Sequence, residues 1–382
     1  MANGNPFSPT FGASPPELAG RDDVLEAIED ALDTGPTHPD YSALLIGARG
    51  TGKTVMLEAI EELARSRGWL TIAETAFPAR LPDRLLRRAA ELLDATGDSQ
   101  GGWRVTGLQA ASLGVTVEHQ DADRRPLDLR AALAALGDRL SEHETGLLIT
   151  LDELQGGDID EVREVGSILQ HVTRREQRPV AFVGAALPSV EDGLLSGDAA
   201  TFLQRCSIHE IGRLTPAATQ AAIAKPIQGL GAEISAEGLS TAVAATAGYP
   251  FMVQLVGFHS WKAAENPMTE ITDANVSTGI DEAERRIGRL VLWPTWKDLS
   301  QVDRNFLIAM TQDLGTSKLS DVAHRLGVTV SYAGVYRQRL LRSGVITAAG
   351  KGQISFTHPS TREWILTLDD TLDSQGEAQP PQ

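Results

Sequence analysis

Residues 42–54 read SALLIGARGTGKT, a short apolar run that passes directly into a glycine-rich loop. The run at 42–46 has the length and composition of a buried parallel strand, and residues 54–67 place apolar side chains at helical spacing. A strand, a glycine-rich loop and a helix in this order direct backbone N–H groups and a helix N-terminus towards one anion. The stretch therefore predicts a phosphate-binding loop within an α/β fold.

The loop has a suitable residue at each position that phosphate binding needs. It consists of Gly47, Ala48, Arg49, Gly50, Thr51, Gly52, Lys53 and Thr54. The glycines let the backbone approach the phosphates, the Lys53 amine would contact the β- and γ-phosphates, and the Thr54 hydroxyl would ligate Mg²⁺. The alternative is a chance turn in a chain with 36 glycines. The preceding strand and the following helix favour a site for ATP.

A second apolar run, LLITLDE at 147–153, ends in two neighbouring carboxylates and resembles a Walker B motif. Asp152 would hold the coordination shell of Mg²⁺, and Glu153 would orient and deprotonate the attacking water. The alternative is a pair of solvated acids at the end of a strand. Together with the loop, the two acids predict ATP hydrolysis with ATP and Mg²⁺ as cofactors.

The bulk composition limits the class of protein. A chain of 382 residues exceeds what one hydrophobic core usually sustains, so two or three domains are expected. Its net charge of −17 excludes non-specific nucleic-acid binding by the whole surface, and the single Cys206 excludes an internal disulfide. The sequence has neither a secretory signal nor an apolar run long enough to span a bilayer, so we expect a cytoplasmic protein without membrane contact.

The pattern of helical and strand signals divides the chain into units of different character. Strands alternate with helices up to about residue 213, and helical periodicity dominates from there to residue 292. Pro294 is expected to break the last of these helices. We predict a flexible leader at 1–16, a P-loop ATPase core with a parallel sheet at 17–213, a helical lid at 214–292, a linker at 293–298, a winged helix-turn-helix at 299–368 and a disordered acidic tail at 369–382. A small β insertion is expected near 101–120.

Residues 299–368 predict a winged helix-turn-helix because three short amphipathic stretches precede a hairpin around 349–352. The segment carries eight Lys or Arg against four Asp or Glu, which is a local charge of +4. A basic unit on an acidic body favours local contact with DNA. The candidate DNA-binding residues are Tyr332, Tyr336, Arg337, Arg339 and Arg342 on the last stretch and Lys351 at the hairpin tip. The alternative is a protein-interaction module.

The order of these motifs resembles an AAA+ ATPase of the archaeal-type and STAND-like branch, which is related to replication-initiator ATPases. The resemblance covers about residues 18–368 and rests mainly on the loop and the acidic strand end. It implies a P-loop core, a helical lid and a C-terminal winged helix. The implied function is a nucleotide-controlled switch that binds DNA, or an ATP-dependent assembly or signalling switch that binds a protein, with an oligomer that depends on nucleotide.

The same resemblance assigns roles outside the loop. Gly20 and Arg21 belong to a segment similar to one that packs on the adenine, and Pro250 lies in a Gly-x-Pro element similar to one near the nucleotide. Arg205 stands where related proteins carry an arginine finger. From local sequence alone, Gly20 and Arg21 could equally precede an ordinary helix, and Pro250 could be a proline in a first helical turn. Arg205 could equally be a surface arginine. After the strand at 180–183 the family usually has a polar sensor residue, whereas this sequence has Gly184, Ala185 and Ala186, so slow hydrolysis is implied.

Overall fold

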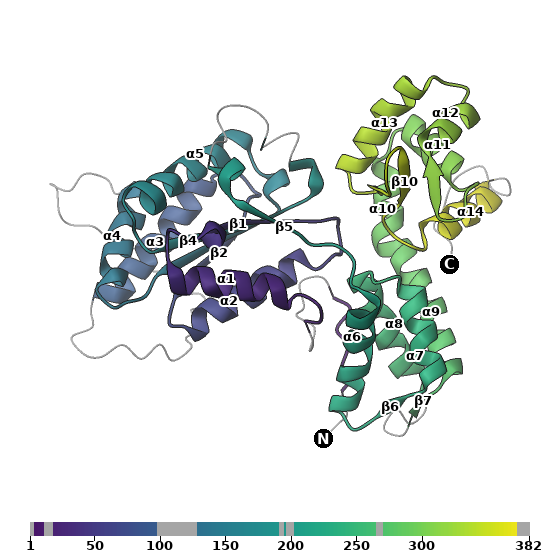
Figure 1. Ribbon diagram of the computed structural model, residues 1–382, viewed down its shortest axis with the longest axis horizontal. Coiled ribbons are helices and arrows are strands. Elements are labelled where there is room, and N and C mark those ends of the chain that lie inside the picture. The colour runs from purple at the N-terminus through teal and green to yellow at the C-terminus, as the bar shows by residue number, and fades with distance from the viewer. Residues whose placement is uncertain are drawn as a thin grey trace.

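The core of the chain is a five-stranded parallel sheet (Figure 1). This computed structural model describes residues 4–10, 18–97, 128–190, 195, 202–264 and 270–372. The strands are β1 (Ser42–Ile46), β2 (Leu70–Thr75), β3 (Leu147–Asp152), β4 (Val180–Ala186) and β5 (Ser207–Glu210), and their order across the sheet is β2-β3-β4-β1-β5. Because β4 pairs in parallel with both β1 and β3, the loop after β1 and the acids at the end of β3 come to the same edge.

Helices cover both faces of the sheet (Figure 1). α1 (Asp22–Thr34) and α2 (Lys53–Ser66) pack on one face, and α3 (Leu81–Gly97), α4 (Leu129–Ser141) and α5 (Ile159–Leu169) pack on the other. This burial explains why β1, β3 and β4 read as continuous apolar runs rather than alternating ones. α5 continues into a π-helical turn (Gln170–Arg175). The predicted α/β core with a parallel sheet is confirmed.

A helical unit (residues 214–292) with its own buried core follows β5. It contains α6 (Pro216–Gly229), α7 (Ala236–Thr246), α8 (Pro250–Ala263) and α9 (Asp273–Ile287). Thr215, Ser235 and Thr272 begin α6, α7 and α9 because their side-chain oxygens accept hydrogen bonds from the first turn. Two strands, β6 (Glu233–Ile234) and β7 (Glu270–Ile271), pair in parallel and are too short for the sequence to predict.

The residues before α1 pack on this helical unit. Phe7 is 2% exposed, and its ring lies against Gly257 in α8, where a side chain would clash with it. The side-chain amide of Asn5 donates to the backbone oxygen of Phe258 at 2.9 Å. The predicted flexible leader is therefore wrong for residues 4–10, because the buried ring of Phe7 and the hydrogen bond of Asn5 hold this segment on α8.

The predicted helix break at Pro294 does not occur. α9 passes through a π-helical turn (Gly288–Leu292) into α10 (Trp293–Asp298). Pro294 stands in the first turn of α10, where its missing N–H and its fixed φ are tolerated. The segment at 293–298 joins the helical unit to the following residues as a helix.

The remaining described residues form a C-terminal unit (residues 299–372) around a buried core of their own. It contains α11 (Gln301–Met310), β8 (Thr316–Lys318), α12 (Leu319–Arg325), α13 (Val330–Arg342), β9 (Ile346–Ala348), β10 (Gln353–Phe356) and α14 (Thr361–Leu372). The strands form an antiparallel sheet in the order β8-β10-β9. Three helices followed by a hairpin match the order predicted for a winged helix-turn-helix, whereas β8 and α14 are additional.

The predicted tail begins too early. Helix α14 includes residues 369–372, because Ile365 and Leu368 anchor it in the core of the C-terminal unit. The tail from 373, the rest of the leader and the predicted β insertion near 101–120 lie outside the described residues. Within the described ranges, no helix is both long enough and apolar enough to cross a membrane.

Replacing Phe7 by Ala should destabilise the protein by about 3 kcal/mol, because it empties a buried ring position. Phe77→Ala is the matched control, since Phe77 is 65% exposed. Thermal unfolding followed by circular dichroism measures the difference. Equal melting temperatures for the two variants would show that the N-terminal segment does not pack on α8.

Candidate nucleotide-binding site

Lys53 is the first residue of α2, directly after the glycine-rich connection from β1. Its side chain is buried, and its Nζ donates hydrogen bonds to the backbone oxygens of Gly47 and Ala48, both at 2.9 Å. Burial lowers the pKa of this amine, and the carboxylates of Glu153 and Asp152 act in the opposite direction. A buried cation is thus held at the N-terminus of α2, where the backbone N–H groups of the first turn lack intrahelical partners.

Two glycines of the loop are required by their surroundings. A side chain at Gly47 would clash with the backbone oxygen of Ile211, which follows β5. Gly50 has a φ of +75°, and a side chain there would clash with the hydroxyl of Tyr249. The loop is therefore enclosed by the end of β5 and by the helical unit, so its glycines serve close packing as well as access for phosphate.

The acids at the end of β3 face the end of the loop. Thr54 Oγ1 donates to Asp152 Oδ2 at 2.7 Å, and the backbone N–H of Glu153 donates to the other oxygen of Asp152 at 2.7 Å. A hydroxyl and a carboxylate this close fit a Mg²⁺ ion, which prefers oxygen ligands. Glu153 is exposed beside them and lines the same cavity as Lys53 and Thr54. The structure thus brings the loop and the two predicted acids together.

A cavity of about 380 Å³ lies between the loop and the helical unit. Loop residues 49–55 and Glu153 supply its polar lining, and Ala19, Leu214 and Phe251 contribute apolar surface. A cavity of this size and mixed lining is typical of small-molecule sites. The combination suits a ligand with a charged end and a flat, less polar end, as a nucleotide has.

The segment before α1 and the start of α8 also reach this site. Arg21 donates to the backbone oxygen of Thr51 in the loop at 3.3 Å. Gly20 has a φ of +67° and lies so close to Ala218 of α6 that a side chain would not fit. Pro250, the first residue of α8, lines the cavity. The structure therefore places Arg21 and Pro250 at the cavity, whereas Gly20 packs beside α6 and does not belong to the cavity lining.

Sequence reasoning missed residues of the N-terminal segment and of α8. Ser8 and Thr10 line the cavity, and the Ser8 N–H donates to the Gln254 side chain at 3.2 Å. Two signals in the sequence point to them. Phe7 is one of two aromatic residues in a polar segment, and Gln254 is the only polar residue within 251–256.

Arg205 lies apart from this cavity. It is exposed in the turn before β5, and the described residues that line the cavity do not include it. The arginine-finger assignment stays a prediction.

The candidate DNA-binding residues of α13 are partly engaged within the C-terminal unit. Arg339 forms an ion pair with the buried Asp303 and lies 4.9 Å from the ring centre of Tyr336. The hydroxyls of Tyr332 and Tyr336 are hydrogen-bonded to each other at 2.9 Å. The Nε of Arg337 is buried without a hydrogen-bond partner among the described residues. Arg339 thus stabilises this unit, a role that helical spacing alone does not reveal.

The exposed surface of α13 mixes apolar and basic side chains. Val330 is 51% exposed and Val335 is 66% exposed. Arg342 at the end of α13 and Lys351 in the turn between β9 and β10 are exposed as well. This surface offers basic groups that suit phosphate and apolar groups that suit a protein.

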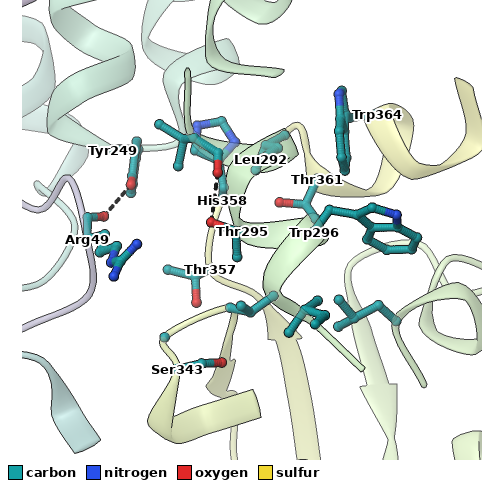
Figure 2. A pocket seen from close by; sticks show the side chains of 15 residues that line it. Arg49, Tyr249, Leu292, Thr295, Trp296, Ser343, Thr357, His358, Thr361 and Trp364 are labelled. Atoms are coloured by element: carbon teal, nitrogen blue, oxygen red, sulfur yellow. Dashed lines mark hydrogen bonds between the residues drawn. The ribbon is translucent and has the colours of Figure 1, made fainter. Parts of the chain in front are cut away.

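The C-terminal unit lies close to the phosphate-binding loop. Gly344, which follows α13, is near enough that an added Cβ would lie 3.8 Å from Ala48 of the loop. Tyr249 of the helical unit donates to the backbone oxygen of Arg49, and its ring packs edge-on against His358, with 4.6 Å between ring centres. Figure 2 shows Arg49, Tyr249 and His358 around a small cavity of about 50 Å³. The loop, the helical unit and the C-terminal unit therefore meet at one junction.

His358 is buried in this junction. Its Nδ1 accepts a hydrogen bond from the N–H of Ser360 at 3.2 Å, and its Nε2 has no hydrogen-bond partner among the described residues. Burial lowers the pKa of His358 to about 3, and the nearby Arg213 adds to the shift. Arg213 itself donates to the backbone oxygens of Phe356 and Thr357. The contact between the units thus requires a neutral imidazole.

The fold is that of the P-loop class of proteins. Residues 17–183 match the family described as AAA ATPase domain. Residues 290–365 match a family described as a domain of unknown function (DUF8462), which covers most of the C-terminal unit. No curated protein sequence matches this one.

Several solved structures are similar to this chain over nearly its whole length. The chain is similar to the Walker-type ATPase of Pyrococcus abyssi, with a TM-score of 0.66 and 11% identity, over 91% of this chain and 96% of that one. It is similar to Cdc6p from Pyrobaculum aerophilum (TM-score 0.51, 16% identity, 95% and 97% covered). It is also similar to the ORC2 protein of Aeropyrum pernix (TM-score 0.51, 14% identity, 94% and 97% covered). Residues 17–183 are thus an AAA ATPase domain, and the chain has the fold of archaeal-type AAA+ P-loop ATPases.

Thr54→Ala should lower the affinity for ATP in the presence of Mg²⁺ by about tenfold, because it removes one oxygen from the proposed ion site. Thr54→Ser is the matched control, since it keeps the hydroxyl next to Asp152. Titration with a fluorescent ATP analogue, with and without Mg²⁺, measures the effect. The same affinity for both variants would contradict a role for Thr54 in Mg²⁺ binding.

Lowering the pH should weaken the junction around His358. Its pKa is about 3 in the folded protein against an ordinary value of 6.5, so the unfolded chain binds more protons between these values. Stability is therefore expected to fall as the pH decreases through this window, by on the order of 1 to 2 kcal/mol between about pH 6.5 and 5.

Thermal unfolding at a series of pH values checks this dependence. His358→Asn should flatten the pH dependence, whereas His324→Asn, which changes an exposed histidine of α12, should keep it. An unchanged pH dependence in His358→Asn would exclude His358 as its source.

Proposed function

We propose that this protein is an ATP-hydrolysing switch whose nucleotide state controls DNA binding by the C-terminal unit. The observation that carries the proposal is the close approach of Gly344 to the phosphate-binding loop, where an added Cβ would lie 3.8 Å from Ala48. The nucleotide would bind at the loop, and the C-terminal unit lines a small cavity together with Arg49 of the same loop. A change of nucleotide at the loop therefore acts on the position of the C-terminal unit.

The chemistry of hydrolysis is assigned to the residues at the end of β3. Glu153 takes a proton from the attacking water, whose oxygen bonds to the γ-phosphorus while the bond to the bridging oxygen of ADP breaks. Lys53 neutralises charge on the β- and γ-phosphates, and Mg²⁺ held by Thr54 and Asp152 supplies further charge neutralisation when bound. The ORC2 structure of Aeropyrum pernix is of complexes with ADPNP and ADP, which supports a nucleotide as the ligand of this fold.

The coupling between nucleotide and C-terminal unit has two contacts in addition to Gly344. Tyr249 links the backbone of Arg49 to the ring of His358. Figure 1 shows α13 on the side of the C-terminal unit that faces the α/β part, and α13 contacts the helical turn Pro188–Val190 after β4. In this arrangement the α/β part occupies space next to the proposed DNA-reading helix. Release of these contacts would move the α/β part away from α13 and leave room there for a duplex.

DNA is the proposed partner because the C-terminal unit has the element order of a winged helix and a local charge of +4. Arg342 and Lys351 are the exposed basic residues assigned to phosphate contacts. A protein partner is the second candidate. It is favoured by the exposure of Val330 and Val335 on the same helix and by the internal ion pair of Arg339.

The full-length protein should bind duplex DNA with an affinity that differs by about tenfold between the ADP and the ADPNP forms. Fluorescence anisotropy at low salt measures this affinity, and repetition at higher salt reports the number of phosphate contacts. Arg342→Ala and Lys351→Ala should each weaken binding, whereas Val335→Ala should not.

Phosphate release by the wild type and by Glu153→Gln tests the catalytic part of the proposal, with the variant expected to be at least about 100-fold slower. Absence of DNA binding in both nucleotide forms would refute DNA as the partner. Sensitivity of a protein complex to Val335→Asp would then support the second candidate.

A further inference from the structure

Gln155 connects the predicted catalytic carboxylate to the end of a neighbouring strand. It is half-buried in the turn after β3. Its side-chain nitrogen donates to Glu153 Oε2, and its side-chain oxygen accepts a hydrogen bond from the N–H of Leu187 at 2.9 Å. Leu187 follows β4 directly. One amide group therefore spans the gap between the acid after β3 and the end of β4.

The orientation of this amide is fixed by its partners. The Glu153 carboxylate only accepts hydrogen bonds, and the Leu187 N–H only donates one. Rotation of the amide by half a turn would set oxygen against oxygen and N–H against N–H. The bond to Glu153 is also charge-assisted, which makes it stronger than a bond between neutral groups. Gln155 therefore has a single favourable arrangement between its two neighbours.

The packing around Gly184 explains why the polar side chain at the end of β4 comes from the turn after β3 and not from β4 itself. A side chain at Gly184 in β4 would clash with Leu154, Leu44 and Phe182. Leu154 fills the space in which a polar residue of β4 would lie, and Ala185 and Ala186 are fully buried. The next residue, Gln155, brings a polar group to the end of β4. The strand that lacks a polar sensor is thus contacted by a polar side chain from the adjacent turn.

Glu153 needs such a partner because its own surroundings restrain its backbone but not its carboxylate. Its φ of +53° and ψ of +42° are uncommon for a residue with a side chain, and its N–H is held by Asp152. The side chain itself is exposed. A flexible carboxylate loses rate as a general base when it samples directions away from the water. The amide of Gln155 limits these directions.

We propose that Gln155 is a positioning residue for ATP hydrolysis, which acts through Glu153 and links its carboxylate to the backbone of Leu187. This inference rests on the proposed function, in which Glu153 is the general base. Gln155 is assigned no contact with the nucleotide. Its removal should therefore change the rate of the chemical step and leave nucleotide affinity unaltered.

The test compares Gln155→Ala, Gln155→Glu and the wild type, with Gln312→Ala as a control at an exposed glutamine of the C-terminal unit. Gln155→Glu keeps an oxygen that accepts from Leu187 but replaces the donor to Glu153 with a like charge. Steady-state ATP hydrolysis gives kcat and KM, and a fluorescent ATP analogue gives the affinity. Both Gln155 variants should lower kcat by about 10- to 100-fold and change affinity by less than about twofold, and Gln312→Ala should behave as the wild type.

A double-mutant cycle separates positioning from general destabilisation. In single-turnover experiments with Glu153→Gln, adding Gln155→Ala should leave the remaining rate unchanged, because its effect requires the carboxylate. Equal losses in both backgrounds would overturn the proposal, as would a wild-type kcat in Gln155→Ala. A wild type that binds ATP without hydrolysing it would instead refute the proposed function and the inference with it.

Discussion

The hydrogen bond between Thr54 Oγ1 and Asp152 Oδ2 joins the two halves of the site, and the remaining features depend on where it lies. It is formed because β1 and β3 flank β4 in parallel, which brings their carboxyl ends to one edge. The loop after β1 then meets the acids of β3 without any intervening segment. The residues proposed to bind phosphate, to hold the metal and to activate water therefore all lie along one short stretch of the sheet edge.

A second tie between the same elements lies deeper in the protein. Thr150 in β3 donates to the carboxylate of Glu61 in α2 at 2.6 Å, and both residues are buried. A buried carboxylate is costly unless it is hydrogen-bonded, so this pair fixes the distance between α2 and β3. The N-terminus of α2, and with it Lys53, is therefore held in register with Asp152. Local polar bonds inside the core thus support the geometry at the surface of the site.

The sequence was sufficient for the parts of the fold that depend on local pattern. The loop at 47–54, the strand that ends at Asp152 and the helices on both sides of the sheet follow from apolar periodicity and glycine spacing. Contacts between distant segments were not predictable in this way. Phe7 packs on α8, and Arg339 pairs with Asp303, because of tertiary neighbours that no local window contains.

The same limit applies to the candidate site. Lys53, Thr54, Asp152 and Glu153 were found because motif spacing encodes their roles. Gln155 was missed because its role appears only when Leu187, 32 residues further on, is placed beside it. The predicted helix break at Pro294 was wrong because a proline is tolerated in the first turn of a helix, which is where Pro294 stands.

The helical connection through Pro294 has a mechanical consequence. From α9 to the end of α10, residues 273–298 are helical throughout, which corresponds to a rod about 39 Å long. A tilt of the rod by about 10° at the helical unit would carry its far end through about 7 Å, a distance larger than one helical turn. A flexible linker would absorb such a tilt by bending, and the C-terminal unit would not move. The rod instead delivers it to the C-terminal unit as a displacement large enough to separate packed surfaces.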